Sequence, residues 1–188
     1  NSSDVDGLAS PLAGLACGGS AIVGDGSTLI LAACEIRNCR TPELPGGSIQ
    51  WTTEGWQYGL GLHGGAIYAE HGTIELHGTT IRDCWAAAEG GAIACFSYAT
   101  AKIDTSSVIS NCSACVGGGA VFGHGYSTVT IHNSTIADCH ARWPWLIGDT
   151  LHVLTSSRRS TRGGAVLLRE NSHGELDGCR VTGCTAEA

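Results

Sequence analysis

The chain has 188 residues, of which 43% are hydrophobic, and a formal net charge of −7 at pH 7. Its single lysine, Lys102, argues against a nucleic-acid partner, because neutralising phosphates requires clustered lysine and arginine. No apolar run approaches the roughly 18 residues of a membrane span, and no charged-then-apolar signal peptide is present, so we expect no membrane span in this segment.

A repeated block organises the chain from residue 18 onward. Each block opens with Gly-Gly-Ala-(Ile/Val) and closes with Ile-x-(Asn/Asp)-Cys or a close variant. After an irregular lead-in over residues 1–17, a looser first copy is followed by four further copies; the five span residues 18–39, 64–84, 90–112, 118–139 and 163–184. Such a period predicts a solenoid, in which each unit buries its apolar face against its neighbours. We therefore expect one domain over residues 18–188.

The spacing between successive Gly-Gly pairs separates a basic coil from its insertions. The two short spacings are 26 and 28 residues, and the two long ones, 45 and 46, place insertion loops at about residues 41–63 and 142–162. Within a coil, apolar residues such as Ile74, Leu76 and Ile81 follow the alternation of short strands rather than a helical period. We expect three short strands per coil, stacked into parallel sheets with equivalent positions roughly 4.8 Å apart.

Two columns of equivalent residues follow from this stacking. One is a small-residue column where two walls approach closely: Ala66, Ala92, Ala120 and Ala165. The other suits a left-handed corner, which Asn and Asp tolerate better than most residues: Asn38, Asp83, Asn111 and Asp138.

The opening GGA(I/V) and the closing Ser/Thr-x-(Ile/Val)-x-(Asn/Asp) resemble the right-handed parallel β-helix repeat of the pectate-lyase-like superfold. They are closest to the GGAI-type repeats of polymorphic outer-membrane proteins and related surface β-helices. The resemblance covers about residues 18–40 and 64–188, although this chain has Cys where those repeats usually close with Asn. It implies an all-β, right-handed parallel β-helix of about five coils, and a secreted scaffold or adhesin as readily as an enzyme.

Five cysteines occupy the closing position of the block: Cys39, Cys84, Cys112, Cys139 and Cys184. Adjacent coils would bring their Cα atoms within disulfide range, so vertical bridges such as Cys84–Cys112 are one interpretation. Bridges within a coil, Cys34–Cys39 and Cys179–Cys184, are a second. A stack of buried thiols that act as small hydrophobic residues is a third. The lone Cys112-x-x-Cys115 pair has no matching second pair, so we expect no zinc, and no metal or cofactor elsewhere.

Polar residues should line the outer face of the strand that carries Leu76 and its equivalents. They are Glu75, His77, Thr130, His132, Glu175 and Asp177, with Asp104 nearby. An enzyme on this fold needs clustered carboxylates, either as metal ligands or as an acid–base pair. Here threonines separate the acidic positions, so we expect a solvated polar face and no catalytic residues.

The tryptophans indicate a different surface. All five lie between a closing cysteine and the next Gly-Gly pair, and therefore at one corner of the coil, where Tyr and Arg residues accompany them. The candidate binding residues are Trp51, Trp56, Tyr58, Trp85, Trp143, Trp145, Arg158 and Arg159. Loops on a rigid scaffold often carry function, and Trp, Tyr and Arg anchor interfaces. The alternative is that these loops fold down and bury their tryptophans on the coil's own flank.

The cysteine number and the sequons at Asn111 and Asn133 favour a secreted or cell-surface glycoprotein. We predict a non-catalytic, extracellular structural or adhesive module of a larger surface protein, filament or complex. Its aromatic loops would recognise a protein neighbour or a glycan, and its ends would stack on another copy or continue in a longer chain. The alternative is a carbohydrate-active lyase or hydrolase of the same superfold.

Overall fold

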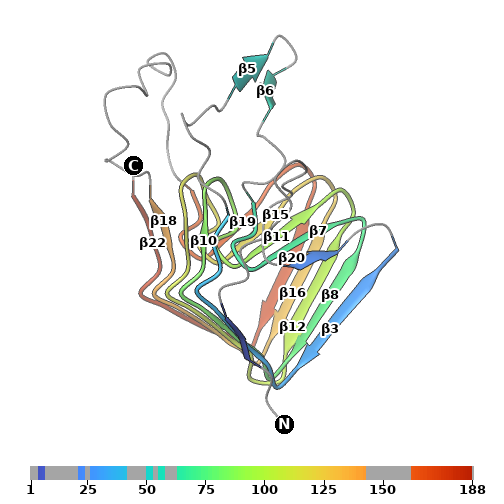
Figure 1. The fold of residues 1–188 in the computed structure, drawn as a ribbon, viewed down its shortest axis with the longest axis vertical. Coiled ribbons are helices and arrows are strands. Elements are labelled where there is room, and N and C mark those ends of the chain that lie inside the picture. Colours follow the sequence, from blue (N-terminus) through green and yellow to red (C-terminus); the bar gives the residue numbers. More distant parts are fainter. Residues whose placement is uncertain are drawn as a thin grey trace.

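The chain winds five times around one axis, and successive windings lie side by side (Figure 1). The computed structural model describes residues 4–6, 21–23, 26–41, 50–52, 55–57, 63–142 and 162–187. These residues form four parallel sheets and one antiparallel hairpin, and they include no helix. The architecture is the all-β parallel β-helix that the repeats predict.

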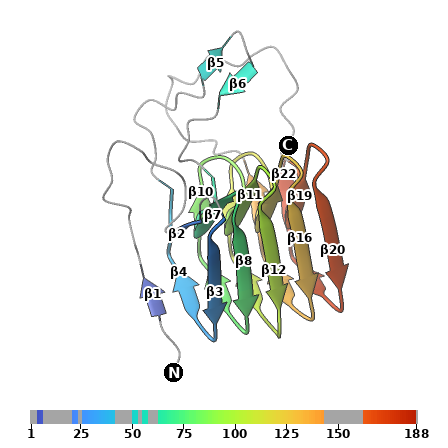
Figure 2. The ribbon, with the colours of Figure 1, turned by 90° about the vertical axis from the view of Figure 1, so that its right-hand side faces the viewer.

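Each parallel sheet is named here by its first and last strand in chain order. The β3–β20 sheet contains β3 (Thr28–Ala32), β8 (Thr73–His77), β12 (Thr100–Asp104), β16 (Thr128–His132) and β20 (His173–Asp177). The β1–β21 sheet contains β1 (Asp4–Asp6), β4 (Glu35–Arg37), β9 (Thr80–Arg82), β13 (Val108–Ser110), β17 (Thr135–Ala137) and β21 (Arg180–Thr182). The strands of the β3–β20 sheet follow one another across the molecule in Figure 2.

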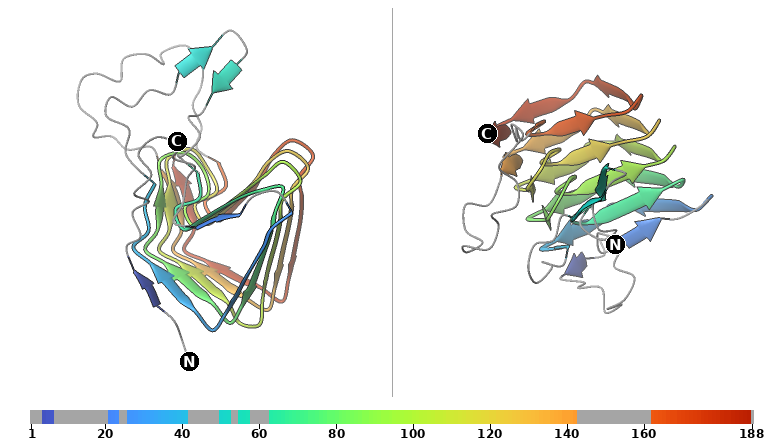
Figure 3. Two further views of the ribbon diagram at one scale, coloured as in Figure 1. Left: turned by 45° about the vertical axis from the view of Figure 1, so that its right-hand side comes forward. Right: turned by 90° about the horizontal axis from the view of Figure 1, so that it is seen from above.

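The other two sheets complete the winding. The β10–β22 sheet contains β10 (Trp85–Ala86), β14 (Ser113–Ala114), β18 (His140–Arg142) and β22 (Thr185–Glu187). The β2–β19 sheet contains β2 (Ala21–Val23), β7 (Ile67–Glu70), β11 (Ile93–Phe96), β15 (Val121–Gly123) and β19 (Val166–Leu168). Seen from above, the windings stack in chain order (Figure 3).

The complete coils contain four strands, so the expectation of three was wrong. The additional strand is the short one that follows the closing cysteine, such as β10 or β14. Its inward residue is a buried alanine, as at Ala86, Ala114 and Ala141. Because only one residue of each repeat points inward here, the period-two pattern is too short to read from the sequence.

The core consists of ladders of like residues in register. Ile109 pairs with Ile81 on one side and Ile136 on the other, and all three are almost fully buried. The alanine column is confirmed: Ala92 donates its backbone N–H to Ala120 and accepts one from Ala66. Each winding therefore buries its apolar residues against the equivalent residues of the windings above and below.

The predicted corners are also confirmed. The Asn/Asp column has left-handed φ angles of 57°, 58°, 50° and 51° at Asn38, Asp83, Asn111 and Asp138 respectively. At the Gly-Gly corner, a Cβ on Gly91 would lie 2.1 Å from the carbonyl oxygen of Gly119. No side chain fits between the windings at that point, which explains the repeated second glycine.

Two segments that the repeats leave without expected strands contain short ones. Within the irregular lead-in expected over residues 1–17, Asp4–Asp6 form strand β1, which pairs with β4 and extends its sheet. Within the first insertion, β5 (Gln50–Thr52) and β6 (Gly55–Gln57) form an antiparallel hairpin whose register places Trp51 opposite Trp56. The second insertion, residues 143–161, lies outside the described residues.

Candidate functional site

Both insertions enter and leave the coil at the same bend, which we call the insertion corner. It lies between the β10–β22 sheet and the β2–β19 sheet, where the first insertion runs from Thr41 to His63 and the second from Arg142 to Arg162. Short coils close the same bend with residues 87–89 and 115–117, and the bridges Glu89–Gly117 and Gly117–Arg162 keep the register across it. The insertions therefore leave the ladder of windings intact.

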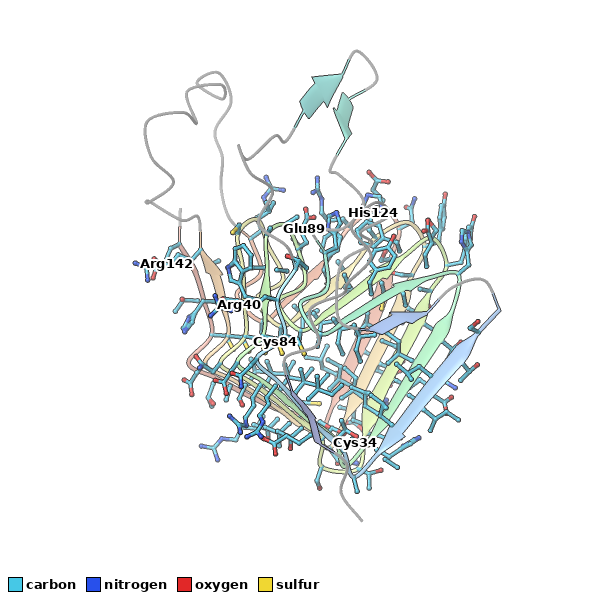
Figure 4. All side chains as sticks on the ribbon, viewed as in Figure 1. Cys34, Arg40, Cys84, Glu89, His124 and Arg142 are labelled. Atoms are coloured by element: carbon cyan, nitrogen blue, oxygen red, sulfur yellow. The ribbon has the colours of Figure 1, made fainter. Side chains whose placement is uncertain are left out.

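Three arginines flank the insertion corner. Arg40, Arg142 and Arg162 are all exposed, and Figure 4 shows Arg40 and Arg142 pointing outward on the same side of the molecule. Arg142 has an exposed ion pair with Glu187, with 3.2 Å between Nε and Oε2. In a chain of net charge −7, these side chains give the corner a locally basic border.

Of the predicted binding residues, only Trp85 has a described side chain. It lies in β10, between Arg40 and Ser113 in register, and is half-buried beside the insertion corner. For Trp51 and Trp56 the structure gives the backbone pairing alone. Tyr58, Trp143, Trp145, Arg158 and Arg159 lie outside the described residues, so their role in binding stays a prediction.

A buried polar pair that the sequence analysis missed lies at the same corner. His63 Nδ1 is 2.9 Å from Glu89 Oε2, and the two side chains are only 5% and 2% exposed. Arg169 Nη1 lies 3.9 Å from the other carboxylate oxygen of Glu89. A buried carboxylate is costly unless it is paired, so these partners make it tolerable in the fold.

Aromatic rings surround this pair on the outer side of the β2–β19 sheet. The His63 ring packs edge-to-face on Phe96 with centroids 4.8 Å apart, and Phe96 lies 5.4 Å from each of Tyr68, Phe122 and His124. Figure 4 labels Glu89 and His124, both on the upper side of the molecule. These rings form a second, smaller hydrophobic cluster next to His63.

The outer face of the β3–β20 sheet is polar, as expected, and Glu75, His77, Lys102 and Asp104 on it interact with one another. Lys102 Nζ donates to Glu75 Oε1 at 2.9 Å, and the register places these residues opposite each other. His77 Nδ1 lies 2.6 Å from Asp104 Oδ1, and its Nε2 lies 3.9 Å from Glu75 Oε2. His77 therefore lies between two carboxylates.

The pKa values of these carboxyl groups do not suit acid catalysis at neutral pH. The pKa of Glu75 is lowered, chiefly by the hydrogen bond from Lys102. The pKa of Asp104 is also lowered, first by the hydrogen bond from Thr105 Oγ1 and then by that with His77. A catalytic general acid needs a raised pKa so that it keeps its proton near pH 7.

The closing cysteines form a vertical column in register. The carbonyl oxygens of four of them each accept a hydrogen bond from the backbone N–H of the residue that follows the closing cysteine of the next winding; these four are Cys39, Cys84, Cys112 and Cys139. Figure 4 shows Cys84 in the interior. A second column contains the other two candidates together with hydroxyl residues: Cys34, Thr79, Ser107, Ser134 and Cys179.

The structure shows these candidates with thiol groups engaged in local hydrogen bonds. The Sγ atoms of Cys84, Cys112 and Cys139 each lie 3.2 Å from the carbonyl oxygen two residues earlier. The remaining candidates, Cys34, Cys39, Cys179 and Cys184, make the same contact at 3.3 to 3.4 Å. The pKa of Cys112 is raised by hydrogen bonds with the Cys139 and Cys84 thiols and by burial. Disulfide formation stays a prediction.

The two sequon asparagines lie at exposed corners. Asn111 Nδ2 donates to Asp83 Oδ1 at 2.5 Å, so a glycan on that nitrogen would have to replace this hydrogen bond. Asn133 is also exposed and has a left-handed φ of 46°. Glycosylation of either residue stays a prediction.

The described residues hold neither a candidate metal cluster nor a candidate membrane-spanning helix. In this part of the chain, no group of three or more His, Cys, Asp or Glu side chains is placed to hold a metal ion. The same part contains no helix long and apolar enough to cross a membrane.

The sheets, their register and the Gly-Gly corners define this molecule as a parallel β-helix. A family model described as a right-handed β-helix region matches residues 64–188, which is more than half of the chain. The chain therefore belongs to the right-handed β-helix family. No curated protein and no solved structure matches it.

Proposed function

We propose that this chain is an extracellular structural or adhesive β-helix module that recognises a protein neighbour or a glycan at the insertion corner. The observation that carries the proposal is that both insertions leave from one bend bordered by the exposed Arg40, Arg142 and Arg162. Arginine and aromatic residues anchor interfaces, and the insertions contain four of the five tryptophans. The basic border favours a partner with carboxylate or sulfate groups.

The apolar surface of the last described winding supports assembly through the ends of the solenoid. Leu176 and Val181 belong to inward-facing ladders, yet they are 46% and 44% exposed. Another winding placed on β19 to β22 would bury them and pair the open sheet edges. We propose that a further coil, either from a second copy or from the same polypeptide, occupies this surface.

The recognition proposal is tested on an oligosaccharide array that contains neutral, carboxylated and sulfated glycans. We expect retention of acidic glycans and its loss in Arg40→Ala/Arg142→Ala and in Trp143→Ala/Trp145→Ala. Ile30→Ala serves as a control, because it removes exposed apolar area away from both the corner and the last described winding. Sedimentation velocity would detect a protein partnership as self-association. Absence of both acidic-glycan binding and self-association would refute the proposal.

A carbohydrate-active enzyme is the second candidate. It is favoured by the gathering of Glu75, His77, Lys102 and Asp104 on one outer face. The lowered carboxyl pKa values count against it, as described above. Release of reducing ends or unsaturated sugars from a polysaccharide panel, abolished by Asp104→Asn, would establish the enzyme and displace the binding module.

A further inference from the structure

The five closing cysteines form one column of sulfur atoms along the inside of the coil. Each Sγ atom lies 3.2 to 3.4 Å from the carbonyl oxygen two residues earlier; the five residues are Cys39, Cys84, Cys112, Cys139 and Cys184. The Sγ atoms of the last three also lie 3.9 to 4.0 Å from a carbonyl oxygen of the preceding winding. We call these five residues the thiol column.

The repeated contacts determine the spacing of the sulfurs. Because the contacts are the same in each winding, each sulfur takes the position of the one before it, moved along the axis by one coil. Neighbouring parallel strands lie about 4.8 Å apart, so we expect about 4.8 Å between neighbouring sulfurs. Four of the five cysteines are at most 1% exposed, and Cys184, in the last described winding, is half-buried. The column is therefore a line of sulfurs in the apolar core that approaches solvent at one end.

The thiols of the column influence one another's ionisation. The hydrogen bond with the Cys112 thiol is the largest cause that lowers the pKa of Cys84 and that of Cys139, whereas the pKa of Cys112 itself is raised. Cys95 is buried as well but has no cysteine in register on either side, and burial raises its pKa to about 12. The middle thiol of the column thus keeps its proton, and its two neighbours lose theirs more easily.

The spacing suits a metal ion held in line between two sulfurs. Two metal–sulfur bonds of about 2.3 Å each span about 4.6 Å, which is close to the spacing of the windings. The side chains point into the coil, across its axis, so an ion between two sulfurs meets each Cβ–Sγ bond at roughly a right angle, where a thiolate has a lone pair. A disulfide would need sulfurs about 2.05 Å apart and Cβ atoms about 3.8 Å apart, so the windings would have to approach each other.

The donor set and the apolar surroundings select the ion. Zinc takes four ligands, and the described residues contain no group of three or more His, Cys, Asp or Glu placed to hold a metal ion. Thiolates prefer soft metal ions, and the soft ion Hg(II) takes two sulfur ligands in line. When it binds, two S–H bonds break, two Hg–S bonds form and two protons leave to solvent, so the core buries no net charge. A monovalent ion such as Cu(I) would leave one negative charge in the core.

We infer that the thiol column binds soft divalent metal ions, represented by Hg(II), as bridges between successive windings. One ion lies between Cys39 and Cys84, a second lies between Cys139 and Cys184, and Cys112 stays protonated between them. Five sulfurs hold two ions, because one thiolate cannot bond two ions in opposite directions along a line. Ions enter at the half-buried Cys184 and move inward by exchange with the spare thiol. This inference does not depend on the insertion corner, because the column lies inside the coil.

The experiment uses the full chain, reduced beforehand, with Hg(II) as the probe. A monothiol competitor removes loosely held metal, and native mass spectrometry then counts the ions that each chain retains. We expect two ions on the wild-type chain and none on Cys84→Ser/Cys139→Ser, because that variant separates the three remaining thiols from one another. Cys112→Ser should still retain two. Serine is the matched replacement, because Ser134 already donates from its Oγ to the carbonyl oxygen of His132, two residues earlier, at 2.8 Å.

Cys95→Ala is the control for a buried cysteine outside the column, and it should leave the count at two. Hg(II) should raise the melting temperature of the wild-type chain and of Cys112→Ser, because the bridges exist only in the folded state. The single variants Cys84→Ser and Cys139→Ser should each retain one ion, which decides the matter if the double variant does not fold. Loss of an ion in Cys112→Ser would overturn the inference. So would retention by the folded double variant, retention of Zn(II) in place of Hg(II), or a wild-type chain that retains no ion.

Discussion

The isoleucine ladder gives a stability prediction that depends directly on the stacking of windings. Ile109 is 1% exposed and lies between Ile81 and Ile136 in register, so neither neighbour can move into the space that a truncation would leave. Ile109→Ala removes three carbons, worth about 0.8 kcal/mol each in transfer free energy, which gives about 2.4 kcal/mol. The unfilled cavity adds to this, for a total of about 3–4 kcal/mol.

The control lies in the same ladder at a different depth. Val181 pairs with Ile136 from the last described winding and is 44% exposed. Val181→Ala removes two partly exposed carbons, so we expect a loss of about 1 kcal/mol or less. Urea denaturation followed by circular dichroism measures both free energies of unfolding. In melting temperature, the Ile109 variant should fall by roughly 7–14 °C.

An equal loss in the two variants would refute the reasoning. It would mean that the burial of a ladder residue does not determine how much it contributes to the free energy of unfolding. It would also mean that neighbouring windings do not stabilise one another as the register implies. The slope of free energy against urea must also stay constant, because a changed slope would indicate that the windings no longer unfold together.

Three further predictions follow from other parts of the fold. Gly91→Ala should prevent stable folding, because its Cβ would lie 2.1 Å from a backbone oxygen of the next winding. The soluble yield and the melting temperature measure this effect. The control is Gly26→Ala, whose Cβ would have no atom within 4 Å; its φ of +66° should lower the free energy of unfolding by only about 1 kcal/mol. Glu89→Ala should lower the free energy of unfolding by about 3–5 kcal/mol, because it leaves a buried imidazole and a guanidinium without their carboxylate, and a loss under 1 kcal/mol would contradict this. Because the pKa of Asp104 is lowered in the folded protein, its carboxylate stabilises the fold at pH values above the ordinary aspartate pKa of about 4. That contribution disappears as the pH falls through the pKa of the folded state. Asp104→Asn should therefore flatten the acid side of a plot of melting temperature against pH. An unchanged acid limb would show that this carboxylate does not contribute.

The fold could be predicted because the sequence repeats its physical constraints once per winding. Each Gly-Gly pair, each Asn or Asp corner and each Ile of the ladder has a counterpart at the same register position, so the same pattern recurs in four or five windings. The fourth strand of the coil was missed for the opposite reason. With one inward residue per repeat, such as Ala86, it leaves no alternation to detect.

The candidate sites were less predictable, because they depend on contacts between residues with different roles in the repeat. His63 is the last residue of the first insertion and Glu89 closes a short coil, and nothing in their spacing shows that they meet at 2.9 Å. The thiol column was easier to recognise, because its five cysteines share one position of the repeat. The contact of each Sγ with the carbonyl oxygen two residues earlier, which aligns the sulfurs, could not be read from that spacing.

The insertion corner has a practical consequence for protein engineering. Hydrogen bonds connect the windings immediately before the first insertion, from Thr41 N to Trp85 O, and immediately after it, from Gly64 N to Glu89 O. The frame is thus closed on both sides of a segment of about twenty residues. Foreign peptides of similar length could replace the two insertions. Both peptides would then be displayed at the insertion corner of the same rigid β-helix.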